Sequence, residues 1–282
     1  MRRRFPILLA TLLLSACEKQ LSEAVDDGDT VLTFRISDSV MRSSVSGYVT
    51  KLNVQIFDTD GQKMFSQMKT QTSADPDFGL MAVSLSEGTY TVVAVGHSSV
   101  KSATIKSPTD VRFTASDGEK LTDTFCCVQA IEVTEEPSQY NMVLQRACAM
   151  VRFRLMDDDI PESFARLKID YSGGSANVNP STLEGITKSQ QSETRQRSES
   201  QVYEVYTFPY LSDTGTLKMT VSALTADGSV IRSRQFDAIP VTRNMITTCK
   251  GIFFSDGDGN ITQSSFGFTV NGQWEGEDTY EF

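Results

Sequence analysis

Apolar and polar residues alternate with a period of two along most of the chain. Clear examples are residues 52–57, LNVQIF, and residues 151–155, VRFRL. A period of two places successive side chains on opposite faces of a β-strand, whereas an amphipathic helix shows a period of 3.6. No long segment shows a helical stripe, and only 110–124 is a candidate for a short helix or turn. The pattern therefore predicts an all-β protein.

The predicted strands are short and are separated by turn sequences such as Glu87-Gly88 and Asp227-Gly228. The clearest strands are 31–36, 52–57, 90–95, 141–144, 148–155, 202–208, 217–224, 230–236, 251–254 and 266–270. Many short strands with regular turn signals are typical of β-sandwiches, and a chain of 282 residues suits two of them in tandem.

We expect the boundary between the two sandwiches near Gln145-Arg146, with residues 31–146 in the first, residues 147–282 in the second, and almost no linker. The segment 172–200 is rich in Gly, Ser, Asn and Gln. It is too long for a hairpin loop, so we expect a mobile surface excursion there.

The first seventeen residues have the order of an export signal. Arg2, Arg3 and Arg4 precede an apolar run that is too short to span a bilayer, and Leu14-Ser15-Ala16 ends it with small residues. Leu14-Ser15-Ala16-Cys17 also resembles a bacterial lipobox, in which cleavage falls between Ala16 and Cys17 and the cysteine is acylated. Residues 1–16 are then the signal peptide, Cys17 is the lipid attachment site, and the polar residues 17–30 are a tether.

The charge balance argues against one class of partner. The chain has 36 acidic and 26 basic residues, for a formal charge of −10. Binding to nucleic acid needs clustered Lys and Arg, so we expect no nucleic-acid partner.

The four cysteines beyond the signal, Cys126, Cys127, Cys148 and Cys249, are expected to be mostly free, small apolar residues. The first two are adjacent, and adjacent cysteines rarely bridge each other. The chain has one histidine and no Cys-x-x-Cys spacing, so a zinc site is not expected.

The sequence offers little for catalysis. The single histidine, His97, follows a strand and is expected at the surface, so no nucleophile–base pair is evident. Residues 255–260, SDGDGN, match the first ligand positions of an EF-hand loop, but Ile261 and Gly267 stand where Gly and a bidentate Glu are required. Asp157-Asp158-Asp159 is expected to be a solvated acidic run. We therefore expect no enzyme, no cofactor and no bound metal.

Several stretches together resemble a known family. They are KLNVQIFDTDGQKMF (51–65), LSEGTYTVVAVGH (85–97) and NMVLQRACAMVRFRL (141–155), which follow the lipobox in this order. This arrangement is similar to the FimB/Mfa-type fimbrillins, which are lipoprotein subunits of type V pili in gram-negative bacteria. The resemblance is weaker beyond residue 155, where LKIDYSGGSANVN (167–179) carries part of it.

The resemblance implies two transthyretin-like β-sandwich domains and assembly by strand exchange between subunits. The first strand, with Val31, Leu32, Phe34 and Ile36, and the C-terminal segment 266–282 are the elements best placed to exchange. Polymerising members of the family are cut by an Arg-specific protease between the first two strands. Arg42 is the candidate site for such processing, and a solvated loop arginine is the alternative.

The sequence thus predicts a structural subunit of a cell-surface pilus that is held at the outer membrane by lipid on Cys17. Its partners would be other pilus subunits. The main rival hypothesis is a surface lipoprotein that binds glycans or host ligands through loops such as 172–200.

Overall fold

The computed structural model describes residues 30–38, 47–115, 119–255 and 267–271. They form an all-β protein, and no α-helix occurs among them. No helix in this part of the chain is long and apolar enough to cross a membrane. The strands are β1 (Thr30–Asp38), β2 (Lys51–Phe57), β3 (Lys69–Thr72), β4 (Leu80–Leu85), β5 (Gly88–His97), β6 (Thr104–Ser107), β7 (Asp110–Arg112), β8 (Phe125–Val133), β9 (Ser138–Arg146), β10 (Ala149–Leu155), β11 (Arg166–Ser172), β12 (Asn177–Val178), β13 (Gln191–Gln196), β14 (Val202–Thr207), β15 (Thr214–Leu224), β16 (Val230–Thr242), β17 (Ile246–Gly251) and β18 (Gly267–Asn271).

The N-terminal half, residues 30–146, is a sandwich made from one sheet that folds over on itself. Its strand order is β3-β2-β5-β8-β9-β1-β4. β8 and β9 pair only at Phe125↔Arg146 and Cys126↔Gln145, so the sheet divides there into two layers. Apolar side chains of β1, β4 and β9 face those of β2, β5 and β8 in one buried cluster. The alternating sequence pattern supplies one apolar row from each strand to this core.

The C-terminal half, from residue 147 onward, has two four-stranded sheets. Their orders are β14-β10-β17-β18 and β13-β11-β15-β16. A second buried cluster lies between them, in which the rings of Phe153 on β10 and Phe236 on β16 are 5.6 Å apart. The predicted hairpin at Asp227-Gly228 is confirmed. It connects β15 to β16, and Gly228 takes a φ of 94°, which favours glycine.

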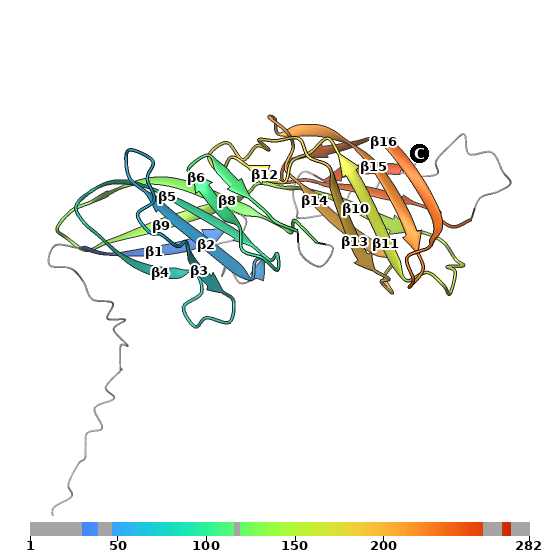
Figure 1. Ribbon diagram of the computed structural model, residues 1–282, viewed down its shortest axis with the longest axis horizontal. Helices are drawn as coiled ribbons and strands as arrows, with labels where there is room; N and C mark the ends of the chain where they lie inside the picture. Colours follow the sequence, from blue (N-terminus) through green and yellow to red (C-terminus); the bar gives the residue numbers. More distant parts are fainter. Residues whose placement is uncertain (1–29, 39–46, 116–118, 256–266, 272–282) are drawn as a thin grey trace, which may run out of the picture.

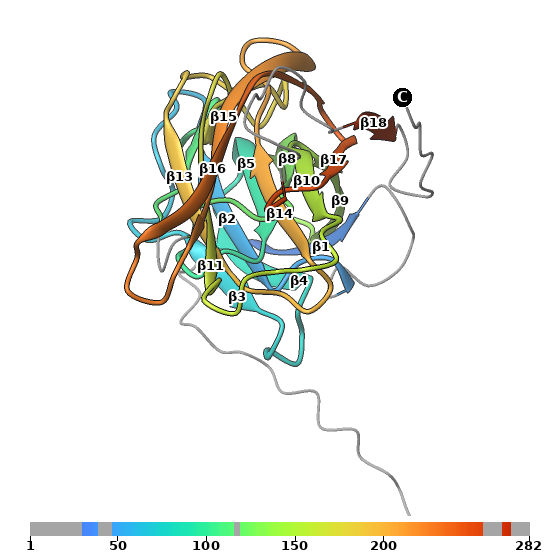
Figure 2. The same cartoon turned by 90° about the vertical axis from the view of Figure 1, so that its right-hand side faces the viewer.

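The two halves lie end to end along the long axis (Figure 1). They share a third apolar cluster. Val95 and Phe113 from the N-terminal half pack in this cluster with Val178 and Phe208 from the C-terminal half. Strand β12 also pairs with β7 across the junction, in the three-stranded sheet β12-β7-β6. A shared core and a shared sheet hold the halves in one arrangement. The view along the long axis shows the layers of the C-terminal half in front (Figure 2).

Three sequence-based expectations about secondary structure are wrong. Residues 172–200 are not a mobile excursion, because they contain β12, the edge strand β13 and the buried side chains of Val178 and Leu183. The segment 110–124, expected to be a short helix or turn, begins with the short strand β7, and its other described residues contain no helix. The strand expected at 251–254 is β17, which ends at Gly251. The four described cysteines are free, as expected.

Candidate functional site

Strand β1 occupies the middle of the three-stranded layer β4-β1-β9. It runs antiparallel to β4, with Phe34 opposite Met81, and parallel to β9, with Phe34 opposite Tyr140. These two neighbours do not pair with each other in the described residues, so β1 supplies the ladder hydrogen bonds on both sides. We refer to the space that β1 fills between β4 and β9 as the β1 slot.

The side chains of β1 divide into two rows. Leu32, Phe34 and Ile36 point into the core and are 0%, 0% and 3% exposed, and the Phe34 ring stacks on Tyr140 with 5.9 Å between centroids. Val31 lies on the outer face and is 43% exposed. Three of the four residues predicted for strand exchange therefore line the core side of the slot. The fourth, Val31, does not face the core.

Three other predicted sites lie outside the described residues. They are Ala16 and Cys17 at the proposed signal cleavage and lipid attachment site, and Arg42 at the proposed processing site. The lipid and processing hypotheses therefore stay predictions.

The C-terminal segment contributes the edge strand β18. It pairs antiparallel with β17, with Phe268 opposite Cys249, and it is the last strand of the sheet β14-β10-β17-β18. Residues 256–266 and 272–282 lie outside the described part, and they include the EF-hand-like residues Asp256, Asp258 and Asn260 and the single tryptophan, Trp274.

Residues 253–255, shortly after β17, are held by a buried carboxylate. Asp157 is 5% exposed and accepts hydrogen bonds from the backbone N–H groups of Phe253, Phe254 and Ser255 at 2.7, 2.6 and 3.3 Å. Arg234 donates to the carbonyl oxygen of Phe253 at 3.1 Å. The expectation that Asp157 is solvated is wrong, since the amide donors after β17 replace its water.

Asp157→Ala is expected to lower the free energy of unfolding by about 3 kcal/mol, because three backbone N–H groups lose their buried acceptor. Urea unfolding measures the change. Asp158→Ala is the matched control, since Asp158 is exposed and its loss should cost less than about 0.5 kcal/mol. Equal effects of the two substitutions would contradict this role for Asp157.

The family follows from a comparison with known proteins. The model of the family described as fimbrillin-A associated anchor proteins Mfa1 and Mfa2 matches residues 15–279. The chain belongs to this family. The resemblance to Mfa-type fimbrillins seen in the sequence is confirmed. No curated protein matches the chain in sequence.

Two solved structures support the fold, and a third, the fimbrial anchor protein Mfa2, resembles the chain only at a lower TM-score. A candidate polysaccharide-binding protein from Bacteroides thetaiotaomicron has a TM-score of 0.53 at 12% identity, over 86% of this chain and 96% of that chain. A candidate adhesin from Bacteroides ovatus has a TM-score of 0.50 at 12% identity, over 77% of this chain and 87% of that chain. The fimbrial anchor protein Mfa2 from Porphyromonas gingivalis has 13% identity over 79% of this chain and 90% of that chain, at a TM-score of 0.43.

In this Mfa-family chain the junction of the halves is organised by Arg146. Its side chain is 2% exposed and bonds Asp123 through Nε at 2.8 Å and Nη2 at 3.0 Å. It also donates from Nη1 to Asn244 of the C-terminal half at 2.9 Å and lies over the Phe125 ring. The residue that marks the expected boundary thus binds both halves.

His97 lies buried beside the same junction, so the expectation of a surface histidine is wrong. It is 0% exposed, its Nε2 contacts Asn53 Oδ1 at 2.8 Å, and its Nδ1 accepts from the Ser99 N–H at 3.1 Å. Burial, with a smaller contribution from the positive charge of Lys51, lowers the pKa of His97 to about 4. The imidazole is therefore neutral in the folded protein.

This buried histidine makes stability depend on pH. Between pH 6.5 and 4 the unfolded chain binds a proton that the folded chain does not, so stability falls as the pH falls through that window. This one group is expected to lower the free energy of unfolding by about 2 kcal/mol between pH 7 and 5. Urea unfolding of the wild type and His97→Gln at both pH values tests this. Between pH 7 and 5, His97→Gln should lose less stability than the wild type. An equal loss would contradict the role of His97 in the pH dependence.

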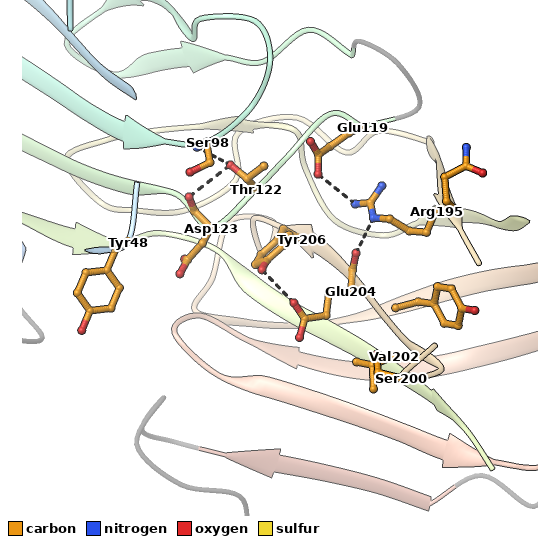
Figure 3. A pocket seen from close by; sticks show the side chains of 12 residues that line it. Tyr48, Ser98, Glu119, Thr122, Asp123, Arg195, Ser200, Val202, Glu204 and Tyr206 are labelled. Carbon is orange, nitrogen blue, oxygen red and sulfur yellow. Dashed lines mark hydrogen bonds and ion pairs between the residues drawn. The ribbon is translucent and has the colours of Figure 1, made fainter. Parts of the chain in front are cut away.

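A crevice of about 590 Å³ opens on the surface between the halves (Figure 3). Tyr48, Ser98, Glu119, Thr122 and Asp123 line it from the N-terminal half. Strands β13 and β14 and the turn between them complete it from the C-terminal half, with Arg195, Gln196, Ser200, Val202, Tyr203, Glu204 and Tyr206. The polar segment 172–200 therefore contributes side chains to a fixed crevice through its strand β13.

Sequence reasoning missed the crevice, the Asp157 contacts and the role of Arg146. Asp157 has the same sequence signal as its exposed neighbours Asp158 and Asp159. The crevice joins residues that lie more than a hundred positions apart, such as Tyr48 and Glu204. Only Arg146 had a local signal, because it stands between two predicted strands.

Proposed function

We propose that the chain is a structural, non-enzymatic subunit of a cell-surface pilus that is anchored in the outer membrane by lipid on Cys17. The family match over residues 15–279 supports a pilus-associated subunit. The lipobox at Leu14-Ser15-Ala16-Cys17 supports the lipid anchor, because stable membrane attachment by lipid needs more than one acyl chain and acylated lipobox cysteines carry several.

Subunits join, in this proposal, by strand exchange at the β1 slot or through the C-terminal segment. The observation that carries it is the position of β1 between two strands that do not pair with each other. A strand from another subunit that replaced β1 would form ladder hydrogen bonds on both sides and fill the core positions of Leu32, Phe34 and Ile36. Cleavage after Arg42 would separate β1 from β2 and free it to leave.

Intact-mass spectrometry of the native chain, taken from membranes and from sheared pili, tests the proposal. We expect the chain in pili and in the outer-membrane fraction, with a mass that starts at Cys17 and includes acyl chains. A chain in the pili that starts at Ser43 would indicate processing after Arg42. Cys17→Ser should release the chain from the membrane fraction.

A lipid-free wild-type chain that is absent from both fractions would contradict the anchor and the pilus role together. Loss of membrane attachment in Arg3→Ser, outside the lipobox, would show that the Cys17 variant reports impaired export and not a missing lipid.

A further inference from the structure

The crevice between the halves has the chemistry of a sugar-binding site. We propose that it binds a neutral oligosaccharide, a function beyond the pilus role and independent of strand exchange. Its volume of about 590 Å³ lies within the roughly 300–1,000 Å³ of small-molecule sites, which form preferentially where two structural units meet.

The charged groups of the crevice are already paired within the protein. Asp123 bonds Arg146 at 2.8 Å, Glu204 bonds Arg152 at 2.8 Å, and Glu119 lies 3.7 Å from Arg195. A phosphate or an ammonium ligand would have to compete with one of these ion pairs. A neutral ligand leaves the ion pairs intact, so charge balance favours it over anions and cations.

The paired carboxylates of the crevice are partly exposed and can accept further hydrogen bonds. A carboxylate offers about four lone-pair positions. Side chains of Glu204, Asp123 and Glu119 are 33%, 19% and 35% exposed, so water reaches part of each. Sugar hydroxyls can replace this water and donate charge-assisted hydrogen bonds to the carboxylates on both walls.

Two tyrosines give the crevice apolar surface. Tyr48 and Tyr206 are half-buried and come from opposite halves, and Figure 3 shows Tyr48 at one end of the lining residues with Arg195 and Glu119 toward the other. The Tyr206 hydroxyl donates to Glu204 Oε2 at 3.4 Å, which orients that ring. A half-exposed aromatic ring can contact the C–H face of a pyranose while the sugar hydroxyls reach the polar groups.

The walls are held in place before any ligand arrives. Arg195 donates from Nε to the backbone carbonyl of Glu204 at 3.1 Å and so joins β13 to β14. Arg146 connects Asp123 to Asn244 in the other half. A rigid site loses little conformational entropy on binding, which favours affinity for flexible oligosaccharides.

Saturation-transfer NMR and calorimetry with the full chain test the proposal. The probes are maltohexaose, cellohexaose, laminarihexaose and mannohexaose, with a heparin hexasaccharide and hexalysine as charged probes. We expect at least one neutral probe to bind. Tyr48→Ala should raise the dissociation constant of that probe by about tenfold or more. The ring centroids of Tyr48 and Phe125 are also 6.1 Å apart, so Tyr48→Ala removes a packing contact as well. A second variant is therefore needed.

Ser200→Trp is that second variant, since Ser200 is an exposed residue at the edge of the crevice and a bulky ring there would fill it. It should abolish binding without changing the melting temperature. Ser192→Trp, at an exposed position of β13 outside the crevice, should bind as the wild type does. Absence of binding to every neutral probe, stronger binding of a charged probe, or binding unchanged by Ser200→Trp would overturn the proposal.

Discussion

Arg146→Ala is expected to lower the free energy of unfolding by about 3 kcal/mol or more. The side chain is 2% exposed and holds Asp123, Asn244 and the Phe125 ring at once. Removing one partner of a buried ion pair leaves the other without compensation, which typically costs about 3–5 kcal/mol. Asp123 is 19% exposed, so water compensates in part and the lower value applies. Urea unfolding at pH 7 measures the change.

Arg112→Ala is the matched control for this substitution. Arg112 also pairs with an aspartate that is 19% exposed, Asp110, but the arginine itself is 45% exposed. Water screens an exposed ion pair, so the control should change the free energy of unfolding little. If Arg146→Ala and Arg112→Ala lower the free energy of unfolding equally, the contacts of Arg146 do not stabilise the junction of the halves.

Phe34→Ala should lower the free energy of unfolding at least as much as Arg146→Ala does, by about 3–5 kcal/mol. Phe34 is fully buried at the centre of β1 and stacks on Tyr140 of β9, so truncation removes apolar contacts on both sides of the slot and leaves a cavity. Val31→Ala is the control in the same strand, because Val31 is 43% exposed and its truncation should cost less than about 0.5 kcal/mol.

Urea unfolding of Phe34→Ala and Val31→Ala at one pH measures the loss of stability in each variant. A loss of 3 kcal/mol for Phe34→Ala with none for Val31→Ala would establish that β1 is bound through its core-facing row. Small losses for both would contradict a packed β1, and with it the idea that a replacement strand gains stability from the same positions.

The sequence was informative where a strand has a strict period of two. β1, β2, β5, β10 and β14 were predicted close to their limits. Buried and more exposed residues alternate along β1 and β14, whereas β2 and the second half of β5 are buried on both faces and were found from their β-branched and apolar residues. β4 was missed, because its exposed positions include Leu80 and Ala82 and its alternation is hidden among apolar residues. Strand order was not predictable, since β1 pairs with β9 more than a hundred positions away.

The candidate site residues also divide into those that local alternation predicts and those that depend on distant parts of the chain. The core-facing row of β1 could be read from the sequence, because burial follows from alternation. His97 and Asp157 could not, because a polar residue is buried only when the fold brings donors or acceptors to it. Those partners, Asn53 and the amides after β17, lie 44 and 96 or more positions away. The crevice depends on how two sandwiches pack, which no local pattern encodes.

Strand exchange at the β1 slot requires that β1 can be replaced by another strand. A specific protease site placed within residues 39–46 allows the folded chain to be cut between β1 and β2, and a fluorescent peptide of residues 30–38, TVLTFRISD, is then added. A peptide with Ala at positions 34 and 36 is the control. We predict that the cut chain takes up the labelled peptide and the uncut chain does not, and that the control peptide fails. Equal uptake by cut and uncut chains, or no uptake by the cut chain even in mild denaturant, would contradict strand exchange at this slot.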